Sequence, residues 1–371
     1  MRVLHFYKSS LPDSVGGVAQ MIHHLAIGTS RLGVRNDVLS TTPQAGQTTT
    51  VAAGGYTVHT AGPSIEVAST SLSLAAAGMF ADLVRSVDLI HYHFPWPFMD
   101  LVHFAVRPHV PAIVTYHSDI VRQRTLRALY RPLQTRFLNA MRAIVATSPN
   151  YAETSDVLAA HAAKVSVIPI GLDSEAYPTA DPARMGYWRS VLGPRFFLFI
   201  GVLRYYKGLH ILLEAARESG YPIVIAGTGA AEDTLRAQAR RLKLDHVTFT
   251  GYVTDADKVA LLTLCEAVVL PSHLRSEAFG IALLEGAMHG KPMICSDIGT
   301  GTSFVNRANE TGLVVPPDNP DALRSAMRDL WDHPEVARAM GARAQERFSQ
   351  HFTAAEMSRS YLALYQHVLG R

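Results

Sequence analysis

The feature that most constrains the fold of this chain is a regular alternation of short apolar runs with longer amphipathic stretches. Val3–Tyr7 opens the series, and a helical pattern follows from Val18 to Leu32, where Gly33 ends it. Several runs are apolar throughout, as in strands that helices cover on both faces. The further runs are Asp88–Phe94, Ala112–His117, Ala143–Thr147 and Val165–Ile170. Alternating strands and helices predict an α/β fold built on a doubly wound parallel sheet.

The alternation pauses once, between Gly171 and Pro194, where glycine, proline and aspartate are frequent. A chain of 371 residues exceeds what one hydrophobic core usually serves. We therefore expect a linker here and two Rossmann-like domains, residues 1–173 and 174–352, facing a central cleft. The apolar runs resume with Phe196–Ile200, Ile223–Ala226, Val247–Thr250, Ala267–Leu270 and Met293–Ser296, and helical patterns close the chain at Asp321–Trp331, Pro334–His351 and Ala354–Leu369.

The balance of residue types fits a packed globular enzyme, because 48% of the residues are hydrophobic and 18% are charged. A formal net charge of +3 is small for this length and does not indicate a nucleic-acid partner. Cys265 and Cys295 stand in apolar runs, as buried thiols of a reducing compartment do. The first residues lack a signal-peptide pattern, and no apolar run approaches the ~20 residues that span a bilayer. We expect a cytoplasmic protein, either soluble or resting on a membrane surface.

The segment from Ser272 to Glu285 combines two carboxylates with a glycine and an apolar run. Gly280 lets the backbone approach a ligand, and the run after it reads as a helix whose first N–H groups favour an anion. Glu277 precedes this helix and Glu285 lies inside it, so both can face one cleft. A carboxylate accepts two hydrogen bonds at once, which suits sugar and ribose hydroxyls. Taken alone, two such acids more often mark an ordinary helix with an acidic first turn.

Two other loops carry residues suited to phosphate. Gly201–Gly208 follows an apolar run and contains Arg204 and Lys207, which can neutralise a diphosphate leaving group. The alternative is a solvated basic turn. Gly16 and Gly17 stand at a predicted helix start, where a glycine pair permits close approach to phosphate, although such a pair is usually only a turn.

Histidines end two of the predicted strands. His117 stands in the sequence VTYHSD, near Asp119, where a lone histidine is more often structural than functional. His91 and His93 could bind a metal, but side chains on a strand alternate between its faces, and we expect these two to point to opposite faces. We therefore predict no metal site and keep His93 as part of a wall for the acceptor.

Three smaller elements suit a nucleotide or a helix start. Gly227 lies where a strand ends and a helix begins, and Val253 lies in a loop after another strand. The pair Asp255 and Asp257 resembles a metal-binding D-x-D, but it stands where a helix N-cap is expected. We interpret it as helix capping.

The stretch from Arg122 to Arg142 contains six arginines and no acidic residue. Apolar residues recur in it at helical spacing, although Pro132 must start or kink a turn. A basic amphipathic helix suits an anionic membrane surface, where each cation adds about 1 kcal/mol. The alternative is a half-buried helix with a solvated basic face. The arginines that we expect at a membrane or lipid acceptor are Arg122, Arg124, Arg127 and Arg131.

Together these motifs resemble the glycosyltransferases of family 4, which are retaining enzymes of the GT-B fold, and the resemblance covers nearly the whole chain. The family pattern E-x-F-G-x3-L-E is met by Glu277, Phe279, Gly280, Leu284 and Glu285. The resemblance implies that Glu277 contacts the donor sugar and that Glu285 holds the ribose hydroxyls. It also implies that residues 353–371 return to the first domain.

The resemblance extends to the other motifs. It implies that Gly16, Gly17, Gly227, Val253 and Ile281 lie along the nucleotide-sugar donor and that His117 lies near the transferred sugar. Lys207 is in register with the family lysine. The family more often has an arginine directly after the first glycine, where this chain has Val202, so Arg204 is its expected replacement.

The sequence is most similar to bacterial O-antigen mannosyl- and rhamnosyltransferases. That similarity implies a GDP-sugar donor, a glycan acceptor on a polyprenyl diphosphate lipid, and no essential metal or other cofactor. A UDP-hexose transferase of the same fold is the alternative within enzymes. A nucleotide-sugar epimerase, favoured by no feature, and a non-catalytic nucleotide-sugar-binding subunit are the others.

Overall fold

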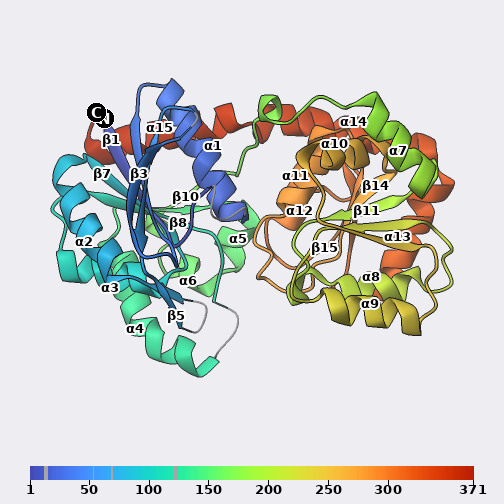
Figure 1. Ribbon diagram of the computed structural model, residues 1–371, viewed down its shortest axis with the longest axis horizontal. Helices are drawn as coiled ribbons and strands as arrows, with labels where there is room; N and C mark the ends of the chain where they lie inside the picture. Colours follow the sequence, from blue (N-terminus) through green and yellow to red (C-terminus); the bar gives the residue numbers. More distant parts are fainter. Residues whose placement is uncertain (12–15, 53, 68–69, 121–123) are drawn as a thin grey trace. The chain divides into compact units, whose positions relative to one another are not determined.

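The computed structural model describes residues 1–11, 16–52, 54–67, 70–120 and 124–371, with the backbone alone for residue 67 and for residues 124–127. The chain forms two compact units, one of Met1–Gly171 with Ala354–Arg371 and one of Leu172–Thr353 (Figure 1). Each unit has its own predominantly parallel sheet with helices packed on it. The α/β expectation is therefore confirmed.

The sheet of the first unit has eight strands among the described residues, in the order β10-β9-β8-β7-β1-β2-β4-β3. Neighbouring strands are parallel except β3 and β4, which are antiparallel. The order reverses between β1 and β7, and at such a switch point the loops after the strands diverge to leave room for a ligand. The strands are β1 (Arg2–Phe6), β2 (Arg35–Thr41), β3 (Gly46–Val51), β4 (Thr57–Gly62), β7 (Leu89–Phe94), β8 (Ala112–Tyr116), β9 (Ala143–Ala146) and β10 (Val165–Val167), with a separate hairpin of β5 (Ile65–Val67) and β6 (Thr70–Leu72).

Helices cover both faces of this sheet: α1 and α15 lie on one face, and α2 and α3 lie on the other (Figure 1). Gly28 of α1 allows α15 to approach closely, because a Cβ there would lie 2.0 Å from Ser358 Oγ. The unit's helices are α1 (Gly17–Arg31), α2 (Leu74–Leu83), α3 (Pro97–Val106), α4 (Arg124–Ala140), α5 (Pro149–Thr154), α6 (Asp156–Ala159) and α15 (Ala354–Leu369), with short 3₁₀ turns η1 (Val84–Ser86) and η2 (Ala162–Lys164).

The C-terminal helix α15 is an integral part of the first unit. Its Tyr361 hydroxyl bonds Thr115 Oγ1 at 2.8 Å, and its Tyr365 hydroxyl bonds His91 Nδ1 at the same distance. Both tyrosines are fully buried. The two chain ends lie together, since Arg371 pairs with Asp88, which also accepts a hydrogen bond from the Arg2 amide (Figure 1).

The second unit has six parallel strands in the order β13-β12-β11-β14-β15-β16. Its switch point lies at β11, which has β12 on one side and β14 on the other. The strands are β11 (Phe197–Ile200), β12 (Ile223–Ala226), β13 (Val247–Gly251), β14 (Ala267–Leu270), β15 (Met293–Ser296) and β16 (Gly312–Val315). The helices are α7 (Pro182–Leu192), α8 (Leu209–Ala216), α9 (Glu232–Arg241), α10 (Asp255–Leu264), α11 (Ile281–Met288), α12 (Thr302–Val305), α13 (Pro320–Asp332) and α14 (Pro334–His351), with 3₁₀ turns η3 (Ser174–Ala176) and η4 (Tyr205–Lys207).

The interruption at Gly171–Pro194 is not the linker that its composition suggested. It contains η3 and α7, and Arg184 and Trp188 of α7 both bond Asp257 at 3.0 Å. The expected linker is wrong except at its first residues, because the units divide between Gly171 and Leu172.

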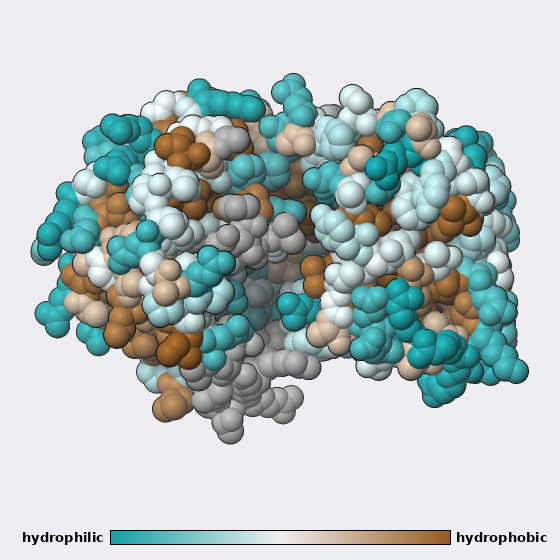
Figure 2. Space-filling model, in the orientation of Figure 1, coloured by the Kyte–Doolittle hydropathy of each residue, from teal (hydrophilic) through white to brown (hydrophobic). Residues whose placement is uncertain are grey.

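Most of the apolar runs named in the sequence are buried inside the two units, while the edge strands β10 and β13 are partly exposed. Hydrophilic residues are spread over the face shown in Figure 2. Among the described helices, none combines the length and the hydropathy needed to cross a bilayer.

Candidate active site

The loops that follow β11 and β14 meet at the switch point of the second sheet. Gly208 makes this approach possible: it has a φ of +69°, and a Cβ on it would lie 1.9 Å from the carbonyl oxygen of Pro271. A backbone hydrogen bond from His273 to Tyr206 also joins the two loops. Because of this contact, Lys207 of the first loop reaches Glu277 of the second.

Lys207 and Glu277 form a largely buried ion pair. Nζ lies 2.5 Å from Oε2, and the side chains are 13% and 10% exposed. Burial acts to lower the pKa of Lys207, but the carboxylate of Glu277 and the nearby Tyr206 raise it, and the net shift is upward. The ammonium is therefore charged at neutral pH. Glu277 Oε1 accepts no hydrogen bond from the described part of the chain.

Glu285 lies within helix α11 of the same unit and belongs to a second charged cluster. Its Oε1 accepts from the Tyr177 hydroxyl at 3.0 Å and lies 3.0 Å from Lys258 Nζ. Burial acts to lower the pKa of Lys258, but Glu285 raises it, and the net shift is upward. Oε2 accepts nothing from the residues that the structure describes, so it can accept from hydroxyl groups of a ligand.

The N-terminus of α11 follows Glu277 directly. Gly280 caps it with a φ of +92°, which a residue with a side chain rarely adopts. The first amides of α11 lack an intrahelical partner, as at any helix start, and this favours an anion. Phe279 is buried against Gly301 and anchors the loop, while Ile281 is half-buried.

The loops after β11 and β12 are also in close contact. A Cβ on Gly227 would lie 2.0 Å from the carbonyl oxygen of Gly201, and one on Gly229 would lie 2.4 Å from that of Leu203. Gly227 donates its amide to the Gly251 carbonyl at the end of β13, two residues before Val253. The glycines therefore pack three strand-end loops along one edge of the sheet.

The acidic pair Asp255 and Asp257 lies in the first turn of α10, where Asp257 has a structural role. Thr254 is the N-cap of α10, and its side chain accepts from the Asp257 amide. Asp257 in turn accepts from Thr254, and it bonds α7 through Arg184 and Trp188. The D-x-D therefore lies at a helix start, as expected, although the cap itself is Thr254.

Arg204 is exposed and precedes the turn that carries Lys207. No ion pair joins it to another described residue. Motif reasoning missed Tyr177, Lys258 and Thr300, whose hydroxyl donates to the Glu277 carbonyl at 2.8 Å. The only sequence signal for Lys258 was its position directly after the D-x-D motif.

In the first unit, Gly16 and Gly17 stand where α1 begins, after β1. Gly16 has extended backbone and caps the helix without a side chain, while Gly17 is its first residue. The glycine pair therefore opens a helix at the carboxyl end of β1, beside the switch point.

His5, His91, His93 and His117 form one buried cluster in this unit. His93 lies between His5 and His117, with ring nitrogens 3.1 Å apart on each side. The expectation that His91 and His93 point to opposite faces is wrong, because residues i and i+2 of a strand share a face, and these rings are 4.3 Å apart.

The role expected for His93 is also wrong. His93 has no exposed surface, so it cannot form a wall against the acceptor, and it contacts His117 through a hydrogen bond instead. Ring nitrogens of His5, His91 and His93 come within 4.8 Å of one another, a spacing that could hold a metal ion. Both nitrogens of each ring already have protein hydrogen-bond partners.

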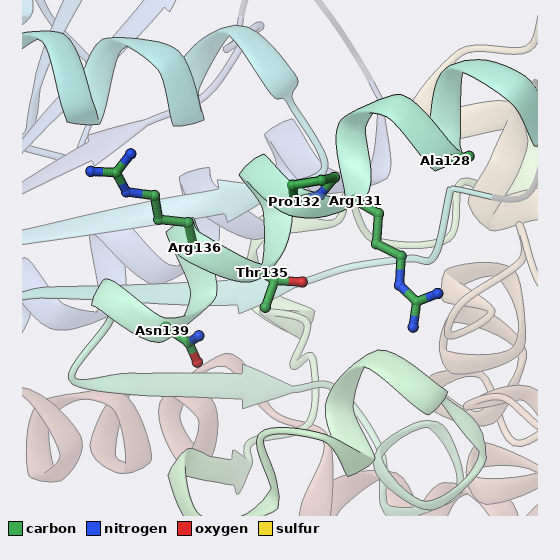
Figure 3. A pocket seen from close by; sticks show the side chains of 6 residues that line it. All are labelled: Ala128, Arg131, Pro132, Thr135, Arg136 and Asn139. Atoms are coloured by element: carbon green, nitrogen blue, oxygen red, sulfur yellow. The ribbon is translucent and has the colours of Figure 1, made fainter.

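Within the basic stretch, Arg124–Ala140 forms α4, which contains Pro132. Phe137 and Leu138 are buried, while Arg131 and Arg136 are exposed and point away from one another (Figure 3). A shallow hollow of about 530 Å³ runs along this face, lined by Ala128, Arg131, Pro132, Thr135, Arg136 and Asn139. Arg122 lies outside the described residues, and only the backbone is described for Arg124 and Arg127.

The chain is similar to known glycosyltransferases over nearly its whole length. Residues 15–176 match the family described as Glycosyltransferase Family 4, and residues 187–347 match Glycosyl transferases group 1. The D-rhamnosyltransferase WbpZ of Pseudomonas aeruginosa is 54% identical over 95% of this chain and 93% of its own. The O-antigen chain mannosyltransferase C of Escherichia coli is 46% identical over 100% and 99%.

Solved structures show the same fold. Sucrose-phosphate synthase of Thermosynechococcus elongatus superimposes with a TM-score of 0.83 at 19% identity, covering 100% of this chain and 99% of its own. Anabaena HepE with UDP-glucose gives 0.76 at 20% identity, covering 99% and 100%. The chain belongs to the family 4 glycosyltransferases of the GT-B fold.

Proposed function

We propose that this glycosyltransferase moves mannose or rhamnose from a GDP-sugar to a lipid-linked glycan during bacterial surface polysaccharide synthesis, with retention of configuration. The Lys207–Glu277 pair carries this proposal, because it places a cation and a carboxylate together at the switch point of a nucleotide-binding type of sheet. The names of the two similar enzymes, a D-rhamnosyltransferase and an O-antigen mannosyltransferase, support the choice of sugar.

The second unit would hold the donor through three contacts. Lys207 and the amides at the start of α11 neutralise the diphosphate, and exposed Arg204 adds a second cation. Glu277 Oε1 accepts from hydroxyls of the sugar. Glu285 Oε2 accepts from the ribose, while Tyr177 and Lys258 fix the other oxygen.

Retention needs attack on the face that the phosphate leaves. The C1–O bond to the diphosphate breaks as the acceptor oxygen bonds to C1, and the departing phosphate oxygen takes the proton of the acceptor hydroxyl. Lys207 is charged at neutral pH and stabilises the leaving diphosphate. His117 would position the sugar, and Gly16 and Gly17 would let the α1 backbone approach the phosphates. No step requires a metal.

The lipid-linked acceptor would bring the protein to the inner face of the cell membrane. The α4 face supports this: Arg131 and Arg136 are exposed beside a hollow, and Leu129 is 80% exposed. Cations and an exposed leucine on one helix suit a surface of anionic lipid.

A thermal-shift plate with GDP, UDP and ADP and their hexose derivatives tests the donor. Stabilisation grows with ligand concentration over Kd, so the preferred base gives the largest shift. We expect GDP and GDP-mannose to raise the melting temperature more than UDP and UDP-glucose at equal concentration. A shift by UDP without one by GDP would contradict the GDP-sugar assignment and favour a UDP-hexose transferase.

A second measurement separates catalysis from binding alone. Incubation with GDP-mannose and a polyprenyl-diphosphate-linked oligosaccharide should release GDP and lengthen the glycan, and the anomeric configuration of the product should match that of the donor. Tight binding of GDP-mannose without any transfer would instead identify a non-catalytic binding subunit.

A further inference from the structure

Of the buried histidine cluster, only His117 has a role in the steps proposed above. The hydrogen bonds that connect His117 to His93 and His5 have a direction that Asn36 sets. Asn36 Nδ2 lies 3.0 Å from the Ala26 carbonyl oxygen and 3.4 Å from that of Val34. Carbonyl oxygens only accept, so this atom must be the amide nitrogen. The other amide atom, Oδ1, then faces His5 Nε2 at 3.3 Å and can only accept. His5 Nε2 therefore carries a proton.

The direction of the next two hydrogen bonds follows if each ring is neutral, because a neutral imidazole has one protonated and one unprotonated nitrogen. Burial lowers the pKa of His5 to about 4 and that of His117 to about 3, and it lowers the pKa of His93 well below the usual value. All three rings are thus neutral at pH 7. His5 Nδ1 has no proton and accepts from His93 Nε2. His93 Nδ1 then has no proton and accepts from His117 Nε2.

From this geometry we infer that Asn36, His5 and His93 are positioning residues that hold His117 as one tautomer, with a proton on Nε2 and a bare lone pair on Nδ1. Among the described residues, no group is hydrogen-bonded to His117 Nδ1. The ring is 5% exposed, at the end of β8. His117 thus offers an acceptor at Nδ1.

The tautomer decides what His117 can do, and this consequence rests on the proposed function. A bare Nδ1 accepts a hydrogen bond from a sugar hydroxyl and orients that hydroxyl. A protonated Nδ1 would donate instead and would favour a phosphate or carbonyl oxygen. The hydrogen-bonded chain from Asn36 through His5 and His93 to His117, called the relay below, thereby selects a hydroxyl-bearing group as the partner of His117.

His91 provides a matched control inside the same cluster. It is as buried as His5, and their ring centroids are 4.9 Å apart. Its nitrogens bond Tyr365 and Thr115 at 2.8 and 2.7 Å, so it is not part of the chain from Asn36 to His117. Its replacement should disturb packing without releasing the tautomer.

The direct test is a multiple-bond ¹H–¹⁵N spectrum of the intact protein with ¹⁵N-labelled histidine at pH 7. Substitution His117→Gln assigns the His117 signals. We expect His5, His93 and His117 all to be protonated on Nε2. A protonated Nδ1 on His117, or a mixture of tautomers, would overturn the inference. Because the tautomers are read from the wild-type protein, this test does not depend on whether variants of Asn36, His5 or His93 fold.

Substitution tests the coupling. His5→Phe removes the acceptor of His93 Nε2–H, so protonation of His117 should shift toward Nδ1, and kcat should fall by roughly tenfold, the worth of one hydrogen bond. His91→Phe should leave the His117 tautomer and kcat unchanged. If both substitutions changed the His117 tautomer and kcat equally, the cluster would have only a packing role and the inference would be wrong.

Two further outcomes are separable. If His117→Gln transfers sugar as fast as the wild type, the proposed role of His117 fails while the tautomer measurement still stands. Stoichiometric Zn²⁺ should leave the histidine spectrum unchanged. If Zn²⁺ instead shifts the His5, His91 and His93 signals together, the cluster is a metal site and the relay is wrong.

Discussion

At the scale of single residues, the second unit depends on two carboxylates that are each held by one oxygen. Lys207 holds Glu277 through Oε2, and Lys258 with Tyr177 holds Glu285 through Oε1. In both cases the other oxygen accepts nothing from the described residues. A charged lysine thus orients each acid through one oxygen and leaves the other oxygen able to accept from hydroxyl groups.

Replacing Lys207 by methionine should lower the affinity for GDP by at least about tenfold, because a charged hydrogen bond to phosphate contributes roughly 1.5–3 kcal/mol. It should also destabilise the unit by about 1–3 kcal/mol, because Glu277 is left unpaired in a largely buried place. Calorimetric titration and denaturant unfolding measure the two effects.

The double substitution of Lys207 by methionine and Glu277 by glutamine separates those effects. It removes both charges, so most of the stability should return while GDP affinity stays low. A double variant that binds GDP like the wild type would exclude Lys207 from the diphosphate site.

Motif spacing predicted these acids and Lys207, but it did not predict Tyr177 and Lys258, the partners of Glu285. Glu277, Glu285 and Lys207 stand in short recognisable patterns, whereas Tyr177 lies more than a hundred residues from Glu285 and carries no local signal. The histidines show a different limit. The repeat of two along a strand places His91 and His93 on one face, and only the parallel pairing of β1 with β7 brings His5 beside them.

At the scale of elements, the strand-end loops depend on glycines that let backbones touch. The sequence predicted these loops because each follows an apolar run. It did not predict β2 or β4, which have buried residues but mixed composition, and it also missed β16, a short apolar strand. The antiparallel edge strand β3 is fully exposed and polar, so no apolar pattern marks it.

Gly227→Ala tests the close contact between the β11 and β12 loops. The new Cβ would meet the Gly201 carbonyl oxygen at 2.0 Å, and φ is +131°, so the loops must separate. We expect a loss of about 1–3 kcal/mol in stability and weaker GDP binding. Gly220→Ala is the control, since its φ of +68° is also positive but nothing lies within 4 Å. Equal losses of GDP affinity in both variants would contradict a role for the loop contact.

The core between β1, β7 and α15 predicts a pH dependence of stability. Burial lowers the pKa of His5 to about 4 and that of His117 to about 3, and it lowers the pKa of His91 and of His93 well below the usual value. Below pH 6.5 the unfolded chain takes up protons that the folded unit refuses, so stability falls with acid by up to about 1.4 kcal/mol per pH unit for each histidine.

Chemical unfolding at pH 7.5, 6.5 and 5.5 measures this slope. His91→Phe should reduce the loss between pH 6.5 and 5.5, because one buried histidine no longer titrates in the unfolded state. Asp37, close to His5, accepts from Arg2 and His59 and stays ionised in this range, since those partners lower its pKa despite burial. An unchanged slope in the variant would show that His91 is not neutral in the folded protein.

At the scale of the whole molecule, each unit has its own sheet and its own switch point, and α15 returns the chain to the unit where it began. The two-unit division followed from length and from the interruption near residue 171. The return of α15 to the first unit was predicted only from the family resemblance, because the amphipathic pattern of a helix does not indicate which of two sheets it packs on.

Membrane attachment is a property of the whole molecule that α4 should dominate. Changing Arg124, Arg127 and Arg131 to glutamate should abolish flotation with vesicles of anionic lipid. The charge-matched control changes Arg240, Arg241 and Lys243, which are exposed at the end of α9 in the other unit. Equal flotation of both variants would contradict a membrane role for α4.

The central claim is that a GDP-sugar held by Lys207, Glu277 and Glu285 is the donor for transfer. A single-turnover assay with radiolabelled GDP-mannose and a lipid-linked oligosaccharide tests it most directly, in the wild type and in Glu277→Gln. We predict one GDP released for each mannose transferred, with a rate at least about a hundredfold lower in Glu277→Gln, a typical loss for a group that acts in the transition state. Transfer by the variant at the wild-type rate would contradict the account.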